Sequence, residues 1–350
     1  MTGVSIIIPI YNVASYIDRC LDSILLQECD DVQIECILVN DCTPDESMTM
    51  VDAKLKNYCG DISFKIINHS DNQGLSKARN TGLKAANNEF VLFVDSDDRL
   101  QPQAIQYLTE GLDDDRIDVV MGNTFVCNRD TIANSLKVNE PLLIDNEDEK
   151  GLRMLLLQDL FHTAWNKLIR REFLINNQIL FENGLIEEDF LWSYLVFLHA
   201  KYIFVKPDVT YIYENNPMSI TNTSSRKIHW IIESRIIICS HIMDNSTKYS
   251  QMECNMYVFY ILIRAINLFE QNASHVSDLW DGLYQVRNRF LKRVAKDGYL
   301  IQFLFFLTSV KPFYFICNIR WYRRYYNKIA SFFLNLNRSF IWRRFFHFSL

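Results

Sequence analysis

The 350-residue sequence lacks the spacings that mark several common kinds of site. Its nine cysteines form no C-x-x-C pair, and its seven histidines show no paired ligand spacing. Disulfide frameworks of secreted proteins, structural zinc sites and zinc hydrolases normally carry such spacings, so the sequence argues against all three. We therefore expect the cysteines to be reduced thiols in the core of a cytosolic protein.

Long hydrophobic runs are also missing. No stretch reaches about 18 uninterrupted apolar residues, the length that a membrane-spanning helix needs. Residues 300–317 come closest, but Gln302, Lys311 and Pro312 interrupt them. The N-terminal apolar run contains Pro9 and no basic residues precede it, which is typical of a first strand rather than a signal peptide. The sequence thus predicts neither a membrane span nor a signal peptide.

Acidic residues are absent after Asp297. The net charge of the chain is −6, but the tail at residues 299–350 carries +8 and the part before it −14. Its basic residues are Lys311, Arg320, Arg323, Arg324, Lys328, Arg338, Arg343 and Arg344. Basic residues beside many aromatic rings favour an anionic membrane interface, with a helical pair packed on the rest of the chain as the alternative. The overall negative charge argues against nucleic acid as the main partner.

The chain is 49% hydrophobic, which is enough for a sizeable core. Its first 125 residues alternate between short apolar runs, typical of buried strands, and segments of helical periodicity. We expect strands at 4–9, 34–39, 64–67 and 90–94, and helices at 14–26, 45–58, 75–86 and 102–112. This alternation predicts an α/β fold with a mostly parallel sheet flanked by helices, whose ligands bind at the carboxyl ends of the strands.

The remaining segments have less regular patterns. Residues 130–150 are polar and acidic and are expected to form a loop or boundary. Residues 151–215 look helical and then strand-like at 202–205 and 210–213, and 226–296 look mostly helical.

Three aspartates follow the fourth expected strand directly: Asp95, Asp97 and Asp98. Three carboxylates within four residues repel one another unless a cation joins them. Hard divalent ions such as Mg²⁺ take oxygen ligands and bind through one or two carboxylates together with substrate phosphates. A solvated turn or a helix N-cap is the alternative, but the place after a buried strand favours a metal site.

Two further segments are expected at the same edge of the sheet. Asp41 follows the second strand, where it can accept a hydrogen bond from a base imide or a ribose hydroxyl, or serve as a turn residue. Gly74 permits a tight turn before the third helix. Lys77 and Arg79 can neutralise a diphosphate near the helix N-terminus, although both types are ordinary on a solvated helix face. Asn80 is harder to explain as an ordinary residue on a solvated helix face.

A second acidic group, Glu187, Glu188 and Asp189, precedes an aromatic and apolar run. A carboxylate against such a run is partly desolvated, which raises its pKa and suits a general base. A capping cluster at the start of a helix is an equally plausible explanation from position alone.

Together these motifs resemble glycosyltransferase family 2, with its GT-A fold, over residues 3–215. The segments concerned are "VSIIIPIYN", "ILVNDCTPDES", "NQGLSKARNTGL", "FVDSDD", "AWNKLIRREFL" and "FENGLIEEDF". Two positions depart from the family pattern, since Asn40 stands for its first acid and Cys42 for its usual glycine. The last two segments are similar to the acceptor-side half of transferases in bacterial capsule, exopolysaccharide and lipopolysaccharide assembly.

The resemblance implies an inverting transferase that moves a sugar from a nucleoside-diphosphate sugar, with UDP the expected carrier, to a hydroxyl of a glycan or lipid-linked acceptor. It implies that Asp41 contacts uracil, that Asp95 faces the ribose, and that Asp97 or Asp98 holds Mg²⁺ or Mn²⁺. Asp189, beside Glu188, is implied as the base. The nucleotide-sugar site is completed by residues at the same strand ends or in the glycine segment: Pro9, Tyr11, Asn12, Gly74, Lys77, Arg79, Asn80 and Ser96.

The implied organisation has a catalytic domain at residues 1–215, with a nucleotide-binding half at about 1–125 and an acceptor half at about 150–215. A helical region at 216–298 and the basic aromatic tail at 299–350 follow. A cytoplasmic enzyme at the inner face of the bacterial membrane fits this arrangement. The main alternative is a non-catalytic carbohydrate-binding or assembly protein on the same fold. A sugar-1-phosphate nucleotidyltransferase would need a glycine-rich loop after the first strand, where this chain reads "PIYNVAS".

Overall fold

A computed structural model describes residues 2–29, 31–112, 116–127, 131–133, 139–146, 162–214, 216, 225–245 and 251–296. The chain divides into two compact units, Met1–Ser224 and Ser225–Leu350. Within the described ranges no helix is both long enough and apolar enough to cross a membrane. The basic aromatic tail at residues 299–350 lies outside them.

The alternation of strands and helices expected for the N-terminal part is confirmed. Strands β1 (Thr2–Ile10), β2 (Val32–Asn40), β3 (Ser63–Asn68) and β4 (Phe90–Phe93) are joined by helices α1 (Ile17–Leu25), α2 (Ser47–Leu55) and α3 (Leu75–Ala85). All four strands are parallel, in the order β3-β2-β1-β4. β1 and β4 are buried along nearly their whole length, which explains their largely apolar sequences.

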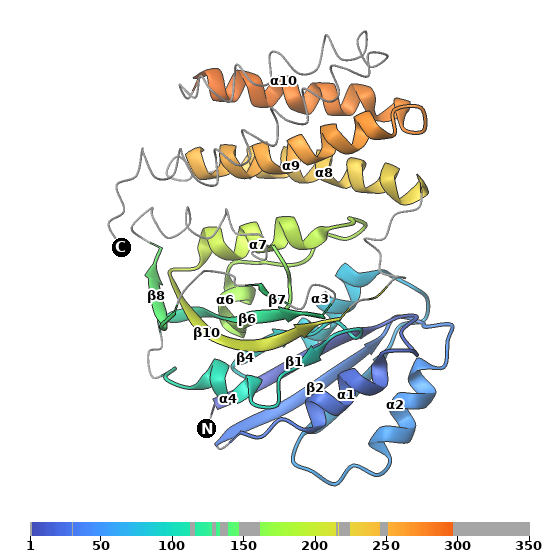
Figure 1. Ribbon diagram of the computed structural model, residues 1–350, viewed down its shortest axis with the longest axis vertical. Coiled ribbons are helices and arrows are strands. Elements are labelled where there is room, and N and C mark those ends of the chain that lie inside the picture. Colours follow the sequence, from blue (N-terminus) through green and yellow to red (C-terminus); the bar gives the residue numbers. More distant parts are fainter. Residues whose placement is uncertain are drawn as a thin grey trace. The chain divides into compact units, whose positions relative to one another are not determined.

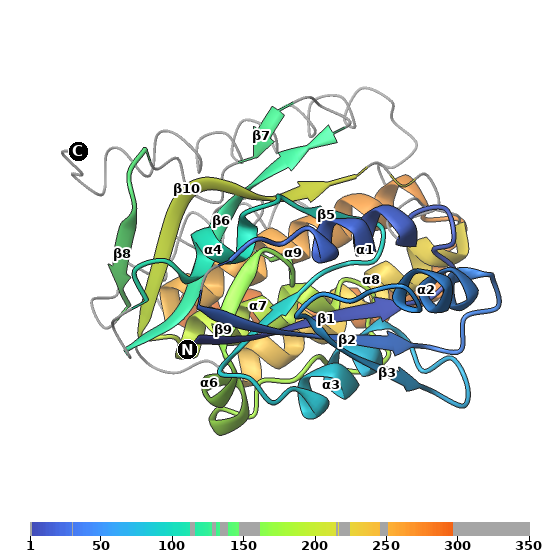
Figure 2. The same cartoon turned by 90° about the horizontal axis from the view of Figure 1, so that it is seen from below.

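The other half of the sheet is mixed (Figures 1 and 2). Strand β9 (Lys167–Arg170) lies antiparallel between β4 and β6 (Ile117–Val126). Next to β6 comes β10 (Tyr202–Tyr213), whose pairing with β6 is parallel and shifts register between Val205 and Val209. β10 is one bulged strand, and it spans both of the short strand-like segments predicted at 202–205 and 210–213. The edge partners are β5 (Arg99–Leu100), β7 (Thr131–Ala133) and β8 (Leu142–Asp145).

The mostly parallel sheet flanked by helices is confirmed, and its antiparallel member β9 pairs with both of its neighbours from a distant part of the chain. One expectation needs correction. Residues 130–150 are not only a loop, because β7 and β8 pair with β6 and β10 there. Polar residues surround both short strands in the sequence, which hides the edge positions that they occupy.

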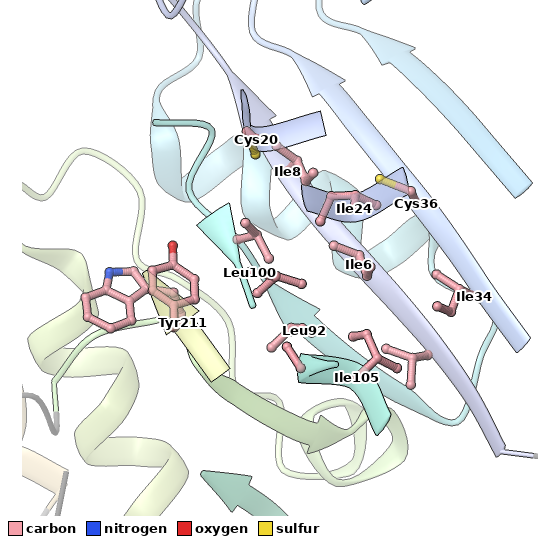
Figure 3. Packing of buried hydrophobic residues seen from close by; sticks show 14 of the residues in the cluster. Ile6, Ile8, Cys20, Ile24, Ile34, Cys36, Leu92, Leu100, Ile105 and Tyr211 are labelled. Atoms are coloured by element: carbon pink, nitrogen blue, oxygen red, sulfur yellow. The ribbon is translucent and has the colours of Figure 1, made fainter. Parts of the chain in front are cut away.

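The two faces of the sheet use alternate residues of each strand. Ile6, Ile8 and their counterparts on β2 and β4 pack against α1, α2 and α4 (Ala104–Thr109), as the close view in Figure 3 shows for Ile6, Ile8 and Ile24. The opposite face carries α3, α6 (Arg171–Asn176) and α7 (Glu188–His199). On that face a Cβ at Gly82 of α3 would lie 2.3 Å from the Ile7 side chain, so only glycine lets α3 approach β1 this closely. The described cysteines are all free thiols, as expected.

The second unit is helical in its described part. It consists of α8 (Ser225–Asn245), α9 (Gln251–Gln271), a 3-10 turn at Ser277–Leu279 and α10 (Trp280–Lys296). The helical patterns expected at 226–296 are therefore confirmed. α10 buries Leu283, Val286, Phe290 and Val294, at the spacing of one helix face.

Candidate functional site

The loops after β1, β2, β3 and β4 meet at the carboxyl edge of the parallel sheet. Ile10 is in register with Asn40, and Asn40 with Asn68, so the three loops begin level with one another. The backbone N–H of Val94, just past β4, donates to the carbonyl of Ile7. The sequence motifs of the N-terminal half are therefore brought to one edge, as the topology predicted.

Asp45 joins the first two loops. Three successive backbone N–H groups, of residues 12–14, donate to Thr43 Oγ1, Ser47 Oγ and Asp45 Oδ2. Asp45 Oδ1 also accepts from Thr43 Oγ1 at 2.7 Å and from Ser47 Oγ at 2.6 Å. Burial alone would raise the pKa of Asp45, but these hydrogen bonds outweigh it and hold the pKa below its ordinary value. The sequence analysis assigned Asp45 no role, although "TPDES" has the spacing of a capping loop.

Asp41 lies at the end of β2 and holds the third loop. Its Oδ1 accepts from Gln73 N at 2.9 Å, and its Oδ2 accepts from Gly74 N at 2.8 Å. His69 Nδ1 lies 2.7 Å from the same Oδ1. Gly74 has φ 88°, so the turn before α3 uses the left-handed conformation that glycine adopts without strain. Cys42 has φ 55°, which is the conformation that the family's usual glycine would adopt freely at this position.

The other expected residues at the strand ends differ in accessibility. Pro9 and Ser96 are buried, whereas Tyr11 is 47% exposed and Asn12 is exposed with φ 56°. Tyr11 is therefore an exposed aromatic residue at this edge of the sheet. Lys77 on α3 is exposed as well.

Asn80 of α3 binds the loop before α7. Its Nδ2 donates to the carbonyl of Phe181 at 2.8 Å, and its Oδ1 accepts from Phe181 N at 2.9 Å. The Phe181 ring stacks on Trp192 with centroids 4.5 Å apart, and both rings meet Phe93 edge-on. This aromatic cluster joins α3, β4 and α7, and it accounts for an asparagine that the sequence alone left unexplained.

Arg79 lies between the two acidic groups. Its Nη2 donates to Asp95 Oδ1 at 2.7 Å, and its Nη1 donates to Glu188 Oε1 at 2.5 Å. The guanidinium stands over the Phe181 ring, 5.1 Å from the centroid, and Arg79 is only 2% exposed. Burial raises the pKa of Glu188, and the charge of Arg79 opposes that rise. A cation on α3 thus joins the strand-end cluster to the first residue of α7.

Asp95, Asp97 and Asp98 each place a carboxylate oxygen within 4.8 Å of the other two. Among the described residues these three form a group that could hold a metal ion, and their all-oxygen donor set fits a hard divalent cation. Burial, and then the neighbouring charges, raise the pKa of Asp97 and raise that of Asp98 well above its ordinary value. Bringing the three together without a cation is therefore unfavourable.

The end of β10 completes this cluster. Tyr211 Oη donates to Asp98 Oδ2 at 2.8 Å, and Glu214 N donates to Asp98 Oδ1 at 2.8 Å. Asn216 Nδ2 donates to Asp97 Oδ2 at 2.8 Å. Both oxygens of Asp98, which is 2% exposed, are thus engaged, whereas Asp97 is only partly buried. The sequence analysis named none of these partners, because they lie more than 110 residues away in the chain.

Glu188 and Asp189 form the first turn of α7. The preceding residue, Glu187, has φ 63°, so the chain enters the helix through a left-handed residue. Burial, and then the charge of Glu188, raise the pKa of Asp189 well above its ordinary value, against the opposing charge of Arg79. Glu188 is buried and Asp189 is partly buried, and the helix continues into the buried residues Phe190, Leu191 and Trp192.

Lys167, at the start of β9, is a buried cation that the sequence analysis did not single out. Its Nζ donates to the carbonyl of Thr163 and, at 3.2 Å, to Thr163 Oγ1. The Phe197 ring of α7 lies 5.9 Å away. Burial lowers the pKa of Lys167 to about 7, and the charge of Asp189 offsets only part of that effect.

Comparison with known proteins agrees with this architecture. The family described as "Glycosyl transferase family 2" matches residues 5–177. The chain is 34% identical to glycosyltransferase EpsJ of Bacillus subtilis over 222 residues, 62% of each chain. It is 30% identical to putative glycosyltransferase EpsH of the same organism, over 65% of this chain and 64% of that one. The chain spans less than two thirds of the length of these relatives.

Two solved structures show the same fold. TarS of S. aureus, residues 1–349 in complex with UDP-GlcNAc, is similar with a TM-score of 0.66 and 22% identity, over 84% of this chain and 82% of that one. Mannosyltransferase PcManGT from Pyrobaculum calidifontis, in complex with GDP-Man and Mn²⁺, has a TM-score of 0.54 at 15% identity, over 97% and 87%. The expected family and fold are confirmed: residues 5–177 match family 2 of the glycosyltransferases, and the chain has the GT-A fold.

Proposed function

We propose that the protein transfers a sugar from a nucleoside-diphosphate sugar, with UDP the expected carrier, to a hydroxyl of a glycan or lipid-linked acceptor in bacterial surface-polysaccharide synthesis. The observation that carries the proposal is the Arg79 bridge between Asp95 and Glu188. It places a carboxylate cluster suited to a metal and a diphosphate next to a desolvated carboxyl pair suited to proton transfer. A non-catalytic carbohydrate-binding protein has no need of such a pair.

The nucleotide half, about residues 1–125, supplies the donor site. Asp41 accepts a hydrogen bond from the base, exposed Tyr11 offers a ring face, and Asp95 faces the ribose. Pro9, Asn12 and Ser96 shape the loops around them. Lys77, exposed on the first turn of α3, is available to the diphosphate. Arg79 has both Nη groups on carboxylates, so its role is to position Asp95 and Glu188 rather than to bind phosphate directly.

The cluster at residues 95–98 is proposed to hold Mg²⁺ or Mn²⁺ through Asp97 and Asp95. Asp97 is favoured over Asp98 because both oxygens of Asp98 already accept hydrogen bonds from Tyr211 and Glu214. A bound divalent ion would supply positive charge against the diphosphate leaving group. TarS is described in complex with UDP-GlcNAc and PcManGT with GDP-Man and Mn²⁺, which supports a nucleotide-sugar and metal site on this fold.

Asp189 is proposed as the general base, with Glu188 held beside it by Arg79. The acceptor oxygen attacks the anomeric carbon while its proton passes to a carboxylate oxygen of Asp189. The bond from that carbon to the diphosphate oxygen breaks, and the electron pair leaves with the nucleoside diphosphate. A single displacement inverts the anomeric centre and needs no covalent enzyme intermediate. One base therefore suffices.

Thermal unfolding with UDP, GDP, CDP, ADP and their sugar derivatives, with and without Mn²⁺, tests the proposed donor site. A ligand that binds only the folded protein raises the unfolding midpoint by mass action. We expect a Mn²⁺-dependent rise with the uridine nucleotides. If no nucleotide raises the midpoint with or without Mn²⁺, the donor site as proposed does not exist.

The tail at residues 299–350 is proposed to contact the inner, anionic face of the bacterial cytoplasmic membrane, where a lipid-linked acceptor would reside. Its composition alone supports this proposal. Replacing Arg323, Arg324, Arg343 and Arg344 by Gln should reduce co-sedimentation with vesicles that contain phosphatidylglycerol, and neutral vesicles serve as the control. Equal sedimentation of the two proteins with the anionic vesicles would contradict the membrane contact.

A further inference from the structure

His69 connects the carboxylate at the end of β2 with helix α3. It directly follows β3, and its backbone N–H donates to the carbonyl of Asn40 at 2.9 Å. Its Nδ1 lies 2.7 Å from Asp41 Oδ1, and its Nε2 lies 3.0 Å from Thr81 Oγ1. The side chains of His69 and Asp41 are only 7% and 4% exposed. The ring is therefore held at both nitrogens within a nearly buried setting.

The chemistry of the partners determines the direction of these hydrogen bonds. A carboxylate accepts hydrogen bonds and does not donate them, so the proton between Asp41 and His69 sits on Nδ1. Nε2 then accepts from the Thr81 hydroxyl when the ring is neutral, or donates to Thr81 Oγ1 when the ring is charged. In either state the ring plane and the position of Asp41 Oδ1 are set by groups on β3 and α3.

The carboxylate of Asp41 has little capacity left for a ligand. Two carboxylate oxygens offer about four acceptor positions. Gln73 N and His69 Nδ1 use two on Oδ1, and Gly74 N uses one on Oδ2. The remaining acceptor position is on Oδ2. A ligand group that meets it must be a donor, such as the ring N–H of uracil, and the unprotonated N3 of cytosine does not qualify.

We propose that His69 is a positioning residue for the base of the nucleotide donor. It acts through Asp41, by fixing which oxygen and which lone pair are offered to the ring N–H of the base. The inference rests on the proposed donor site, and it adds the residue that makes this site selective. Thr81 is the outer member of the same chain of hydrogen bonds, since it orients the ring from the far side.

Two amide substitutions separate the two nitrogens of the ring. The side-chain nitrogen of asparagine takes the place of Nδ1, so His69→Asn keeps the bond to Asp41. The side-chain nitrogen of glutamine takes the place of Nε2. His69→Gln therefore keeps a hydrogen-bond partner for Thr81 and loses the hydrogen bond to Asp41. Thr81→Val removes the outer hydroxyl without changing the volume of the side chain. His199→Gln, at the end of α7, is the matched control outside the site.

The measurements are dissociation constants for UDP and CDP by calorimetry with Mn²⁺, and KM and kcat for the sugar donor. We expect His69→Asn to bind UDP within about twofold of the unsubstituted protein. His69→Gln should bind UDP about tenfold more weakly, as for the loss of one hydrogen bond to a charged group. Its preference for UDP over CDP should shrink, and its donor KM should rise while kcat changes little. Thr81→Val should show a smaller change in the same direction.

A purely structural role of His69 predicts a different result. His69→Gln would then lower the unfolding midpoint and leave the ratio of UDP to CDP affinity unchanged in the folded protein, which would overturn the inference. If His69→Gln does not fold, an unchanged ratio in Thr81→Val overturns it equally. Failure of the unsubstituted protein to bind any nucleotide would instead contradict the proposed function, so the two failures are distinguishable.

Discussion

The Nη1 group of Arg79 donates a hydrogen bond to Oε1 of Glu188 at 2.5 Å, across 109 positions of the chain. This contact joins the third helix of the nucleotide half to the first residue of α7. The other Nη group reaches Asp95, so one buried guanidinium serves two carboxylates. The planar fork of arginine suits such a bridge, whereas the single ammonium of lysine does not.

Arg79→Met should destabilise the protein by about 3 kcal/mol, because it leaves the buried Glu188 and the partly buried Asp95 without their cation. Arg79→Lys should recover only part of the loss. Arg170→Met is a suitable control, since Arg170 pairs with the more exposed Glu89 and its loss should cost about 1 kcal/mol or less. Urea unfolding measures all three. If Arg79→Met and Arg170→Met lower the free energy of unfolding by similar amounts, the Arg79 bridge contributes no more to stability than the pair of Arg170 with Glu89.

Asp97→Asn should remove the Mn²⁺-dependent part of the rise in unfolding midpoint with UDP, because Asp97 is the proposed main ligand. Asp98→Asn should keep most of that rise, since Tyr211 Oη and Glu214 N already donate hydrogen bonds to the two oxygens of Asp98. Without metal, Asp97→Asn should unfold at the same or a higher temperature, because it relieves repulsion among three carboxylates. Thermal unfolding with and without Mn²⁺ and UDP measures both effects. If Asp98→Asn removes the Mn²⁺-dependent rise and Asp97→Asn keeps it, Asp98 is the main metal ligand instead of Asp97.

Asp189→Asn should leave UDP affinity unchanged and lower the transfer rate by about 10²- to 10⁴-fold, as for the loss of a general base. Glu182→Gln is the control, because Glu182 is an exposed carboxylate in the loop before α7. Sugar transfer and UDP calorimetry are measured on the same preparations. Transfer at the unsubstituted rate by Asp189→Asn would remove this residue from the mechanism.

The pH dependence of transfer offers a second test of Asp189. A general base acts when it is unprotonated, so the rate should rise with pH through the pKa of Asp189. Because burial raises that pKa, the acidic limb should lie above the ordinary carboxyl range. The limb should disappear from the residual activity of Asp189→Asn. An acidic limb in the ordinary range of a solvent-exposed aspartate would contradict a desolvated base.

Because of Lys167, the free energy of unfolding should be higher at alkaline pH than at neutral pH. Its pKa is about 7 in the folded protein and 10.5 in its ordinary state, so the unfolded chain binds this proton more tightly. The free energy of unfolding therefore rises with pH between these two values, by at most about 1.4 kcal/mol per pH unit. Lys167→Met lacks this titrating group. The difference between its free energy of unfolding and that of the unsubstituted protein should therefore change between pH 7 and 10.5. Urea unfolding from pH 7 to 10 measures it, and exposed Lys77→Met should give a profile parallel to that of the unsubstituted protein.

Strands β1 to β4 and the helices that follow them could be predicted because short, mostly apolar segments alternate with segments of helical periodicity. The places of Asp41 and the 95–98 cluster followed from that pattern, since residues after parallel strands share one edge. Strand β9 could not be predicted, because Lys167–Arg170 is a four-residue segment whose pairing with β4 and β6 depends on residues far away in the chain. The short edge strands β7 and β8 were missed for the same reason.

Within the site, the sequence by itself determined which residue types are present and at which strand ends they stand. Local hydrophobic pattern suffices for that, because it decides which segments are buried. Only the tertiary structure decided their partners: Arg79 with Glu188, Asp98 with Tyr211, and His69 with Asp41. A buried charge or polar group needs a compensating partner, and that partner comes from whichever distant segment the packing brings within hydrogen-bond distance.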